Sequence, residues 1–208
     1  MKIYLAQLTA LSRPSQSSQT LIQSLLACLS SDETARYHRF VRSERARQFL
    51  VGRYLLRQRL GEMLDIAPAE VPLIERANNA PLLDPALPQK ISFSISHSRL
   101  WVACAISTDA NIGLDIEVID HQRDILALAE HSLEATQLAH FLTLEKQQGI
   151  DYFYRYWTTQ EAQFKLHVSC KSLMHLSYPH PPQAAELAIC FASDQVISSN
   201  PSIIEVSI

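Results

Sequence analysis

The feature that most limits the possible folds is a short segment in which apolar and polar residues alternate, Ile112–Val118. Strict alternation is typical of a β-strand, because successive side chains point to opposite faces. The apolar residues would face a core, and the other face would carry Gly113, Asp115 and Glu117. Two acids so placed lie roughly 7 Å apart along the backbone. Taken alone, the segment indicates a half-exposed edge strand with two solvated carboxylates, since burying the acids requires a cation between them.

A second segment, about forty residues later, predicts an amphipathic helix within Gly149–Val168. Trp157, Glu161 and Lys165 follow one another at intervals of four residues and therefore share one helix face. Alone, this pattern predicts an exposed Glu161–Lys165 ion pair, worth a few tenths of a kcal/mol. Combined with the two acids of the strand, the helix supplies a third carboxylate and a lysine. Such a set can hold Mg²⁺ and steady the phosphates of a ligand.

The bulk composition describes an ordinary globular chain. It has 208 residues, 47% of them apolar and 19% charged, and a net charge of −3, which does not favour nucleic-acid binding. The four cysteines are scattered, so we expect reduced thiols and a cytoplasmic protein. No apolar run reaches membrane-spanning length, and the start lacks a signal peptide's apolar segment. With four glycines, the chain has no glycine-rich phosphate loop.

The element pattern predicts an α/β (α+β) protein of two similar halves, 1–109 and 110–208. Each half would pair a small, mainly antiparallel sheet with one long helix, Ser43–Leu64 in the first half. We expect a loop over Ser12–Thr20, helices over 21–29 and 31–40, and strands that include Lys2–Leu8, Ile91–Ser96 and Trp101–Ile106. We expect the second half to end in strands that include Gln195–Ser198 and Ile203–Val206. The repeated order of helix and strands favours a pseudo-twofold arrangement.

The stretch Arg36–Arg59 is the most basic part of the chain, with eight arginines. For most of them we expect a solvated helix surface.

These motifs, in this order, resemble those of the Sfp-type 4′-phosphopantetheinyl transferases. The family's G-[IV]-D-[IVL]-E motif is matched by Gly113–Glu117, and its W-x-x-K-E-[AS]-x-x-K motif by Trp157–Lys165. Its Ser-His-Ser after a strand is matched by Ser96-His97-Ser98, and its arginine-rich helix motif by Phe40–Arg57. Glu134 matches a glutamate of the linking helix. The resemblance covers roughly Met1–Leu176.

The resemblance implies an Mg²⁺-dependent transferase. Such an enzyme moves the 4′-phosphopantetheine arm of coenzyme A to a serine of an acyl or peptidyl carrier protein and releases 3′,5′-ADP. It implies a cytoplasmic monomer with coenzyme A in the cleft between the halves, and neither nucleic acid nor membrane as a partner.

The resemblance also implies roles for individual residues. Asp115, Glu117 and Glu161 would bind the metal, and Lys165 would contact the phosphates. Glu134, or Glu161 through a water, would be the base that takes the serine proton. The residues expected to bind coenzyme A are Arg36, Arg47, Ser96, His97 and Lys165.

Two positions depart from the family pattern. Gln160 replaces the lysine before the motif glutamate, and Asn79-Ala80-Pro81 replaces Gly-Lys-Pro. Both lysines would have faced phosphates, so a non-catalytic relative that binds coenzyme A or a carrier protein is an alternative. A metal-dependent nuclease is a second alternative, although Glu161 and Lys165 lie four residues apart on a helix and the net charge is negative. A purely structural protein would leave the three acids unexplained.

Overall fold

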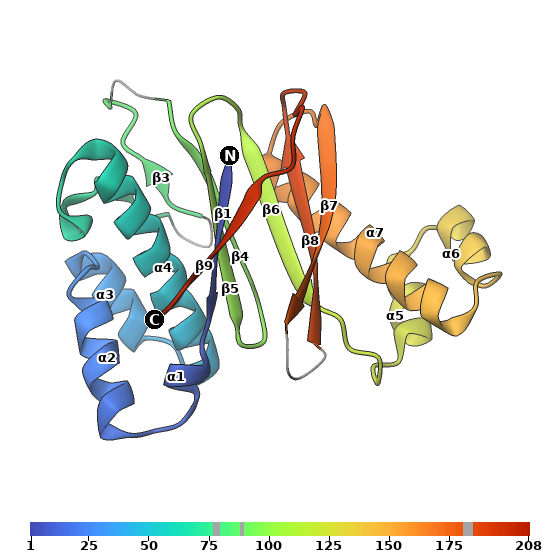
Figure 1. Cartoon of the computed structure of the whole chain (residues 1–208), viewed down its shortest axis with the longest axis horizontal. Coiled ribbons are helices and arrows are strands. Elements are labelled where there is room, and N and C mark those ends of the chain that lie inside the picture. The colour runs from blue at the N-terminus through green and yellow to red at the C-terminus, as the bar shows by residue number, and fades with distance from the viewer. Residues whose placement is uncertain (77–79, 88–89, 181–184) are drawn as a thin grey trace. The chain divides into compact units, whose positions relative to one another are not determined.

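The fold was analysed in a computed structural model, which describes residues 1–76, 80–87, 90–180 and 185–208. Within these ranges the chain forms seven α-helices and nine strands in three sheets (Figure 1). The predicted mixed α/β class is thereby confirmed, and the pseudo-twofold relation of the halves stays a prediction. The structure divides into two compact units, unit 1 (Met1–Ile112 with Ser198–Ile208) and unit 2 (Gly113–Ile197). No helix in the described part is both long and apolar enough to cross a membrane.

Unit 1 contains a four-stranded sheet in the order β4-β5-β1-β9. β1 (Lys2–Gln7) pairs antiparallel with β5 (Trp101–Ser107), which pairs antiparallel with β4 (Ser92–Ser98). On its other edge β1 pairs in parallel with β9 (Ser202–Val206). We expected this last strand to complete the second half, but it joins the sheet of unit 1 instead.

The expected strand over Gln195–Ser198 is wrong. The chain turns after β8 (Ala185–Ser193), where the backbone N–H of Gln195 donates to Ser193 Oγ at 3.1 Å. A side chain that bonds to the backbone two residues on favours a turn over a strand.

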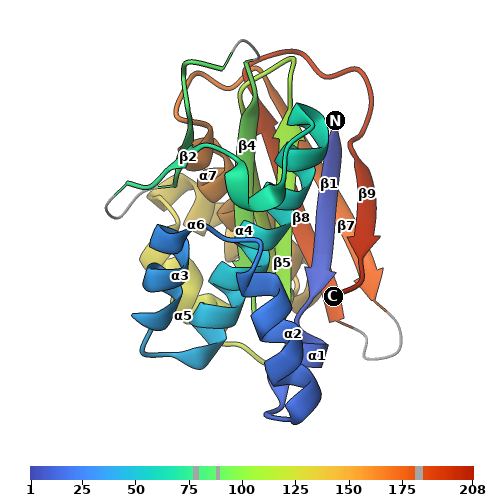
Figure 2. The same cartoon turned by 90° about the vertical axis from the view of Figure 1, so that its left-hand side faces the viewer.

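The long helix α4 (Ser43–Leu64) has the predicted bounds and lies along the sheet, with α2 and α3 on its far side (Figures 1 and 2). One of its faces buries the fully enclosed Leu50, Leu55 and Leu56 in a core shared with β5. Three shorter helices precede it, α1 (Thr9–Ser12), α2 (Gln16–Leu26) and α3 (Ser31–His38).

Helix α2 begins inside the segment that we expected to be a loop. Ser15 caps it, because its side chain accepts from the N–H of Ser18 while the Ser18 side chain bonds back to the Ser15 backbone. The serine-rich run is therefore a helix start.

Buried ion pairs join α3 and α4 to the segment after α4, which contains the 3₁₀ turn η1 (Pro68–Glu70), β2 (Leu73–Ile74) and β3 (Leu82–Leu83). Arg57, 1% exposed, pairs with the fully buried Glu33 and donates to the carbonyls of Pro68, Ala69 and Val71. Arg53 pairs with Glu75 at 2.8 Å. Because every partner is buried or half-buried, these bonds fix the course of this segment.

Unit 2 contains a three-stranded sheet in the order β6-β8-β7, formed by β6 (Ile112–Val118), β8 and β7 (Ser172–His180). β7 and β8 pair antiparallel. The long helix α7 (Lys146–Leu166) packs on this sheet through Ala162 and Leu166. Two short helices, α5 (Ile125–Ser132) and α6 (Ala135–Phe141), lie beside the N-terminal half of α7 and share a core with Phe153 (Figure 1).

Candidate functional site

The centre of the candidate site in unit 2 is an ion pair between β6 and α7. Lys165 Nζ lies 2.7 Å from Asp115 Oδ1, and the Asp115 side chain is only 6% exposed whereas that of Lys165 is 27% exposed. The two residues are 50 positions apart in the sequence, and the fold brings them together. The lysine charge offsets part of the cost of burying the carboxylate.

The expectation of two solvated acids on a half-exposed strand is wrong for Asp115. A Cβ placed on Gly113 would come within 1.9 Å of the Ala162 carbonyl oxygen, so α7 lies directly against this face of β6. Glycine is required here because the helix backbone fills the space of a side chain. The alternation was read correctly as a strand, but it does not reveal that a helix covers the polar face.

Glu117 lies on the same face of β6 as Asp115 and is half-buried. Two contacts at the ends of the strand show which part of α7 lies opposite Glu117. Gly113 lies against Ala162, whereas the backbone N–H of Asp120 donates to the hydroxyl of Tyr154 at 3.0 Å. Strand and helix therefore run in opposite directions. Glu161, also half-buried, lies on the part of α7 between Tyr154 and Ala162.

The residues of this face suit a hard metal ion by type. In the part of the chain that the structure describes, however, no three His, Cys, Asp or Glu side chains form a group that could hold a metal. Mg²⁺ is often bound by one or two carboxylates together with phosphate oxygens of the substrate. Asp115 and Glu117, on one face of one strand, fit that mode, and a closed three-acid cage is not needed.

The structure places Glu134 at the N-cap of α6, with an exposed side chain that makes no capping hydrogen bond. It therefore lies just before the linking helix, and its role as a base stays a prediction.

Two of the arginines expected to bind coenzyme A have protein partners in unit 1. Arg36 Nη1 is 2.7 Å from a carboxylate oxygen of Glu75, and its guanidinium lies over the ring of Phe49. Arg47 Nη1 donates to the carbonyl of Ser12 at 3.4 Å. The charge of Arg36 is thus neutralised within unit 1, and both ligand assignments stay predictions.

His97 lies half-buried on β4, next to the buried Ser96. Arg45, which we had not singled out, lies beside it with Nη1 at 2.9 Å from Nε2 and 3.1 Å from Nδ1 of the ring. The same Nη1 donates to Gln48 Oε1 at 3.0 Å, and Gln48 Nε2 donates to the carbonyl of Arg99 at 2.8 Å. The sequence could have indicated only the contact between Arg45 and Gln48, because the two residues are three positions apart on a helix. The contact with β4 is non-local and is not visible in the sequence.

Gln160 and Ala80, which replace two lysines of the family pattern, are exposed. Gln160 is exposed on α7, next to the half-buried Glu161. Ala80 is exposed and its carbonyl accepts from Arg76 Nε at 2.8 Å, whereas Asn79 lies outside the described residues.

Two of the four cysteines, Cys104 and Cys190, are buried and unsuited to act as nucleophiles. All four are free, as predicted. Burial raises the pKa of the Cys104 thiol and that of the Cys190 thiol to about 12, so both stay protonated.

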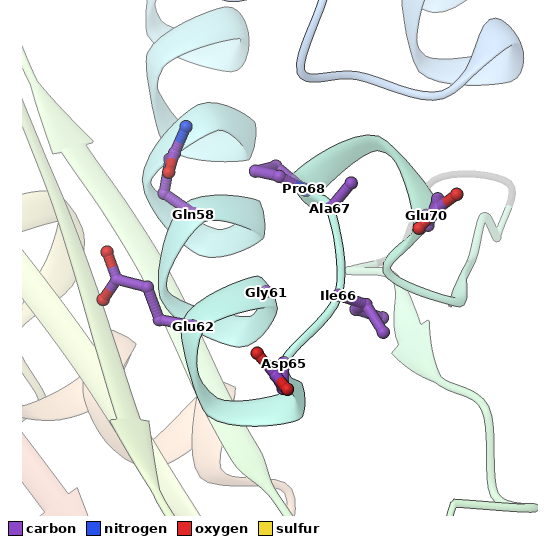
Figure 3. Close-up of a pocket in the computed structure, with 8 residues that line it drawn as sticks. All are labelled: Gln58, Gly61, Glu62, Asp65, Ile66, Ala67, Pro68 and Glu70. Atoms are coloured by element: carbon purple, nitrogen blue, oxygen red, sulfur yellow. The ribbon is translucent and has the colours of Figure 1, made fainter.

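A hollow of about 420 Å³ in unit 1 lies between the end of α4 and the segment that folds back beside it, Ile66–Glu70 (Figure 3). Its lining includes three carboxylates, Glu62, Asp65 and Glu70, which would repel a phosphate. A second hollow of about 320 Å³ in unit 2 is lined by α5, α6 and α7 and is mainly apolar. Neither contains Asp115, Lys165 or His97.

Comparison with known proteins agrees with the motif order. The family described as "4′-phosphopantetheinyl transferase, N-terminal" matches residues 13–109, and the "4′-phosphopantetheinyl transferase superfamily" matches residues 111–195.

Curated relatives give the same result. The chain is 33% identical to the 4′-phosphopantetheinyl transferase HetI of Nostoc sp., over 73% of this chain and 65% of HetI. It is 32% identical to the 4′-phosphopantetheinyl transferase psf-1 of Bacillus pumilus, over 80% of this chain and 68% of psf-1. It is 28% identical to the 4′-phosphopantetheinyl transferase Sfp of Bacillus subtilis, over 71% of this chain and 64% of Sfp. The matches thus span less than two thirds of HetI and of Sfp. On these matches the chain belongs to the 4′-phosphopantetheinyl transferase superfamily, as its Sfp-type motifs predicted.

Proposed function

We propose that this protein transfers the 4′-phosphopantetheine arm of coenzyme A to a serine of an acyl or peptidyl carrier protein and releases 3′,5′-ADP. The observation that carries the proposal is the Asp115–Lys165 pair, held at 2.7 Å where α7 crosses β6. It joins the two motifs that define the resemblance. Dependence on Mg²⁺, a monomeric state and a cytoplasmic location belong to the same proposal.

The reaction exchanges one P–O bond for another. The serine oxygen forms a bond to the phosphorus that carries the pantetheine arm, while the bridging P–O bond of the diphosphate breaks. Negative charge then accumulates on the leaving 3′,5′-ADP. A lysine at the phosphates stabilises this charge electrostatically. Lys165 is suited to that task, because Asp115 holds its ammonium group in place while 27% of its side chain remains exposed.

The serine must lose its proton as it attacks. Glu161 is one helical turn before Lys165 and half-buried, so a carboxylate is available beside the same phosphates. Glu134, exposed at the start of α6, is the other candidate. The accepted proton would leave to water when the products dissociate.

In the proposal, Asp115, Glu117 and Glu161 would hold Mg²⁺. The metal would neutralise charge on the diphosphate. The oxygen-only donor set on one face of β6 supports this assignment.

The alternative is a relative that binds coenzyme A or a carrier protein without transfer. The exposed Gln160 and Ala80, in place of two lysines of the family pattern, favour it. The paired Asp115 and Lys165 favour the enzyme.

Mass spectrometry of apo-carrier proteins, incubated with coenzyme A, Mg²⁺ and this protein, tests the proposal. We expect a mass gain of one phosphopantetheine arm on the carrier serine, lost in Glu161→Gln. Glu130→Gln, an exposed glutamate of α5, is the matched control and should keep the activity. Binding of coenzyme A without any mass gain on a panel of carriers would favour the non-catalytic alternative.

A further inference from the structure

Polar contacts hold helix α7 to the sheet of unit 2 on both of its sides. On one side Lys165 Nζ lies 2.7 Å from Asp115 Oδ1 of β6. On the other side Thr159 Oγ1 lies 3.3 Å from His175 Nε2 of β7. β6 and β7 are the two outer strands of the three-stranded sheet, so α7 is attached at both edges. The second contact has no part in the motifs, because Thr159 occupies an unspecified motif position and His175 lies outside them.

The contact between Thr159 and His175 has a defined direction. The Thr159 hydroxyl lies 2.7 Å from the carbonyl oxygen of Arg155, one helical turn earlier, and donates its proton there. The hydroxyl oxygen is then an acceptor, so we assign the proton between the two side chains to His175 Nε2. His175 is half-buried and lies directly opposite the buried Cys190 in the pairing of β7 with β8. The donor therefore belongs to a residue that the sheet holds in place.

The geometry of the helix places the two contacts on opposite sides of Ala162. Ala162 is fully buried, and its carbonyl oxygen lies against Gly113 of β6. At about 100° per residue, Thr159 lies about 60° to one side of Ala162 and Lys165 about 60° to the other. The side chains packed between helix and sheet here are mostly small, those of Ala162, Cys190 and Ala192 with Leu166. Small side chains form shallow ridges and oppose the rotation of a helix only weakly.

A rotation of α7 about its axis would displace the side chains that the reaction requires. A side-chain end lies about 5–6 Å from the helix axis, so a rotation of about 20° moves it by about 2 Å. A misplacement of about 1 Å in an active site can cost about a hundredfold in rate. The pair with Asp115 does not prevent such a rotation by itself, because the Lys165 ammonium group ends a flexible four-carbon chain. A second contact on the other side of the helix fixes its orientation.

We propose that Thr159 and His175 are positioning residues, which fix the rotation of α7 and thereby hold Lys165 and Glu161 at the phosphates of coenzyme A. The inference rests on the proposed function, because Lys165 and Glu161 have these roles only in that reaction. Thr159 and His175 act through the helix and do not touch the substrate. Their loss should lower kcat more than it changes KM, since the charge on the leaving group develops only in the transition state.

Steady-state transfer kinetics of Thr159→Val test the proposal, because valine keeps the branched shape of threonine and removes the hydroxyl. We expect kcat to fall about tenfold, while KM for coenzyme A changes by less than about twofold. His175→Leu should have the same effect. Thr159→Ser keeps the hydroxyl and should keep most of the rate, and His175→Gln should recover part of it because an amide N–H can replace the ring donor.

Thr158→Val is the matched control. Thr158 is fully buried at the neighbouring position of α7, and in the described part of the chain its hydroxyl bonds only to the helix carbonyls of Tyr154 and Arg155. The change therefore removes a hydroxyl from the same helix without removing a contact to a strand, and kcat should stay at the wild-type value. Thermal unfolding of each variant gives the folded fraction to which the rates are normalised.

A wild-type kcat in Thr159→Val, or equal losses in the two valine variants, would overturn the positioning role and leave the proposed function standing. A wild-type protein that transfers no phosphopantetheine arm to any carrier protein would instead overturn the proposed function, and this inference with it.

Discussion

Lys165, in the last turn of α7, forms an ion pair with Asp115 of β6. Their side chains are 27% and 6% exposed, respectively. The pair changes what the removal of Asp115 should do. From the strand pattern alone we expected a solvated carboxylate. In the structure, its loss removes a charged partner, 2.7 Å away, of the partly buried Lys165 ammonium.

We therefore predict that Asp115→Ala lowers the free energy of unfolding by about 1–3 kcal/mol, the cost of losing a hydrogen bond between charged groups. Lys165→Met should cost a similar amount, and the double variant should cost less than the sum of the two. Urea denaturation of the four proteins measures this coupling, with Glu130→Ala as an exposed control. Additive losses would show that the pair does not contribute to stability. Transfer activity of the folded fraction, measured against Mg²⁺ concentration, tests the metal assignment separately.

Gly113→Ala should prevent α7 from packing on β6. The added Cβ would lie 1.9 Å from the Ala162 carbonyl oxygen and 2.8 Å from the Leu166 nitrogen, and backbone atoms cannot move aside as a side-chain end can. We expect a loss of at least about 3 kcal/mol, beyond the usual cost of overpacking. Gly52→Ala is the control, since its Cβ would meet only side-chain atoms, those of Ile95 at 3.0 Å and of Val102 at 3.5 Å. Thermal unfolding of both variants compares them, and a wild-type melting temperature for Gly113→Ala would contradict the close approach.

Glu33→Gln should be among the most destabilising single changes in unit 1. Glu33 is fully buried and paired with Arg57, which is 1% exposed, so the change leaves a buried guanidinium charge uncompensated. We expect a loss of about 3–5 kcal/mol. Glutamine preserves the capping position at the start of α3, so lost capping cannot explain the loss. Glu62→Gln removes a more exposed pair with Arg59 and should cost less than about 1 kcal/mol. Chemical denaturation that gave equal losses would contradict this difference.

His175 should make stability depend on pH. Burial, and the nearby charge of Arg155, lower its pKa below the ordinary 6.5. Below pH 6.5 the unfolded chain therefore takes up a proton at this residue that the folded chain does not, and folding becomes less favourable as the pH falls. In His175→Gln the decrease in unfolding free energy between pH 7 and pH 5.5 should be smaller than in the wild type. His121→Gln, at an exposed position, should keep the wild-type slope. An unchanged slope in His175→Gln would refute the prediction.

Gln160→Lys tests whether the departure from the family pattern has a functional effect. A lysine next to Glu161 would add a positive charge near the diphosphate of coenzyme A. Because position 160 is exposed, we expect a gain of about 1 kcal/mol, roughly a fivefold lower Kd. Transfer rates measured against coenzyme A concentration for both proteins give the answer. Restored transfer in a protein whose wild type has none would favour the non-catalytic alternative. If neither affinity nor rate changes, Gln160 does not face the ligand.

Local patterns predicted the elements that depend on local forces. The apolar spacing of α4 and the alternation of β6 gave the bounds observed, Ser43–Leu64 and Ile112–Val118. The start of α2 was missed because serines were read as loop residues, whereas Ser15 and Ser18 form a capping box. The Gln195–Ser198 strand was wrong because an apolar residue among polar ones can equally belong to a turn.

The site was predictable only as a set of residues. The motifs identified Asp115 and Lys165, but their ion pair depends on α7 covering β6, a contact 50 residues apart in the sequence. From the basic stretch, Arg47 was predicted to bind coenzyme A. In the structure it is Arg45, from the same stretch, that lies beside His97. The position of an arginine along a helix shows which face of the helix it occupies. It does not show which strand packs against that face, so the contact partner of each arginine could not be predicted.

The parallel pairing of β1 with β9 has a consequence for how the chain folds as it is synthesised. Lys2 lies opposite Ser202, so this edge of the unit 1 sheet can form only after the whole of unit 2 has been translated. Until then β1 presents unpaired backbone groups, which can attract another chain. Closing so long a loop is also slow, because its entropy must be lost before the strand hydrogen bonds compensate for it. The nascent protein therefore has an open β-edge during most of its synthesis, and unit 2 is free to fold before unit 1 is complete.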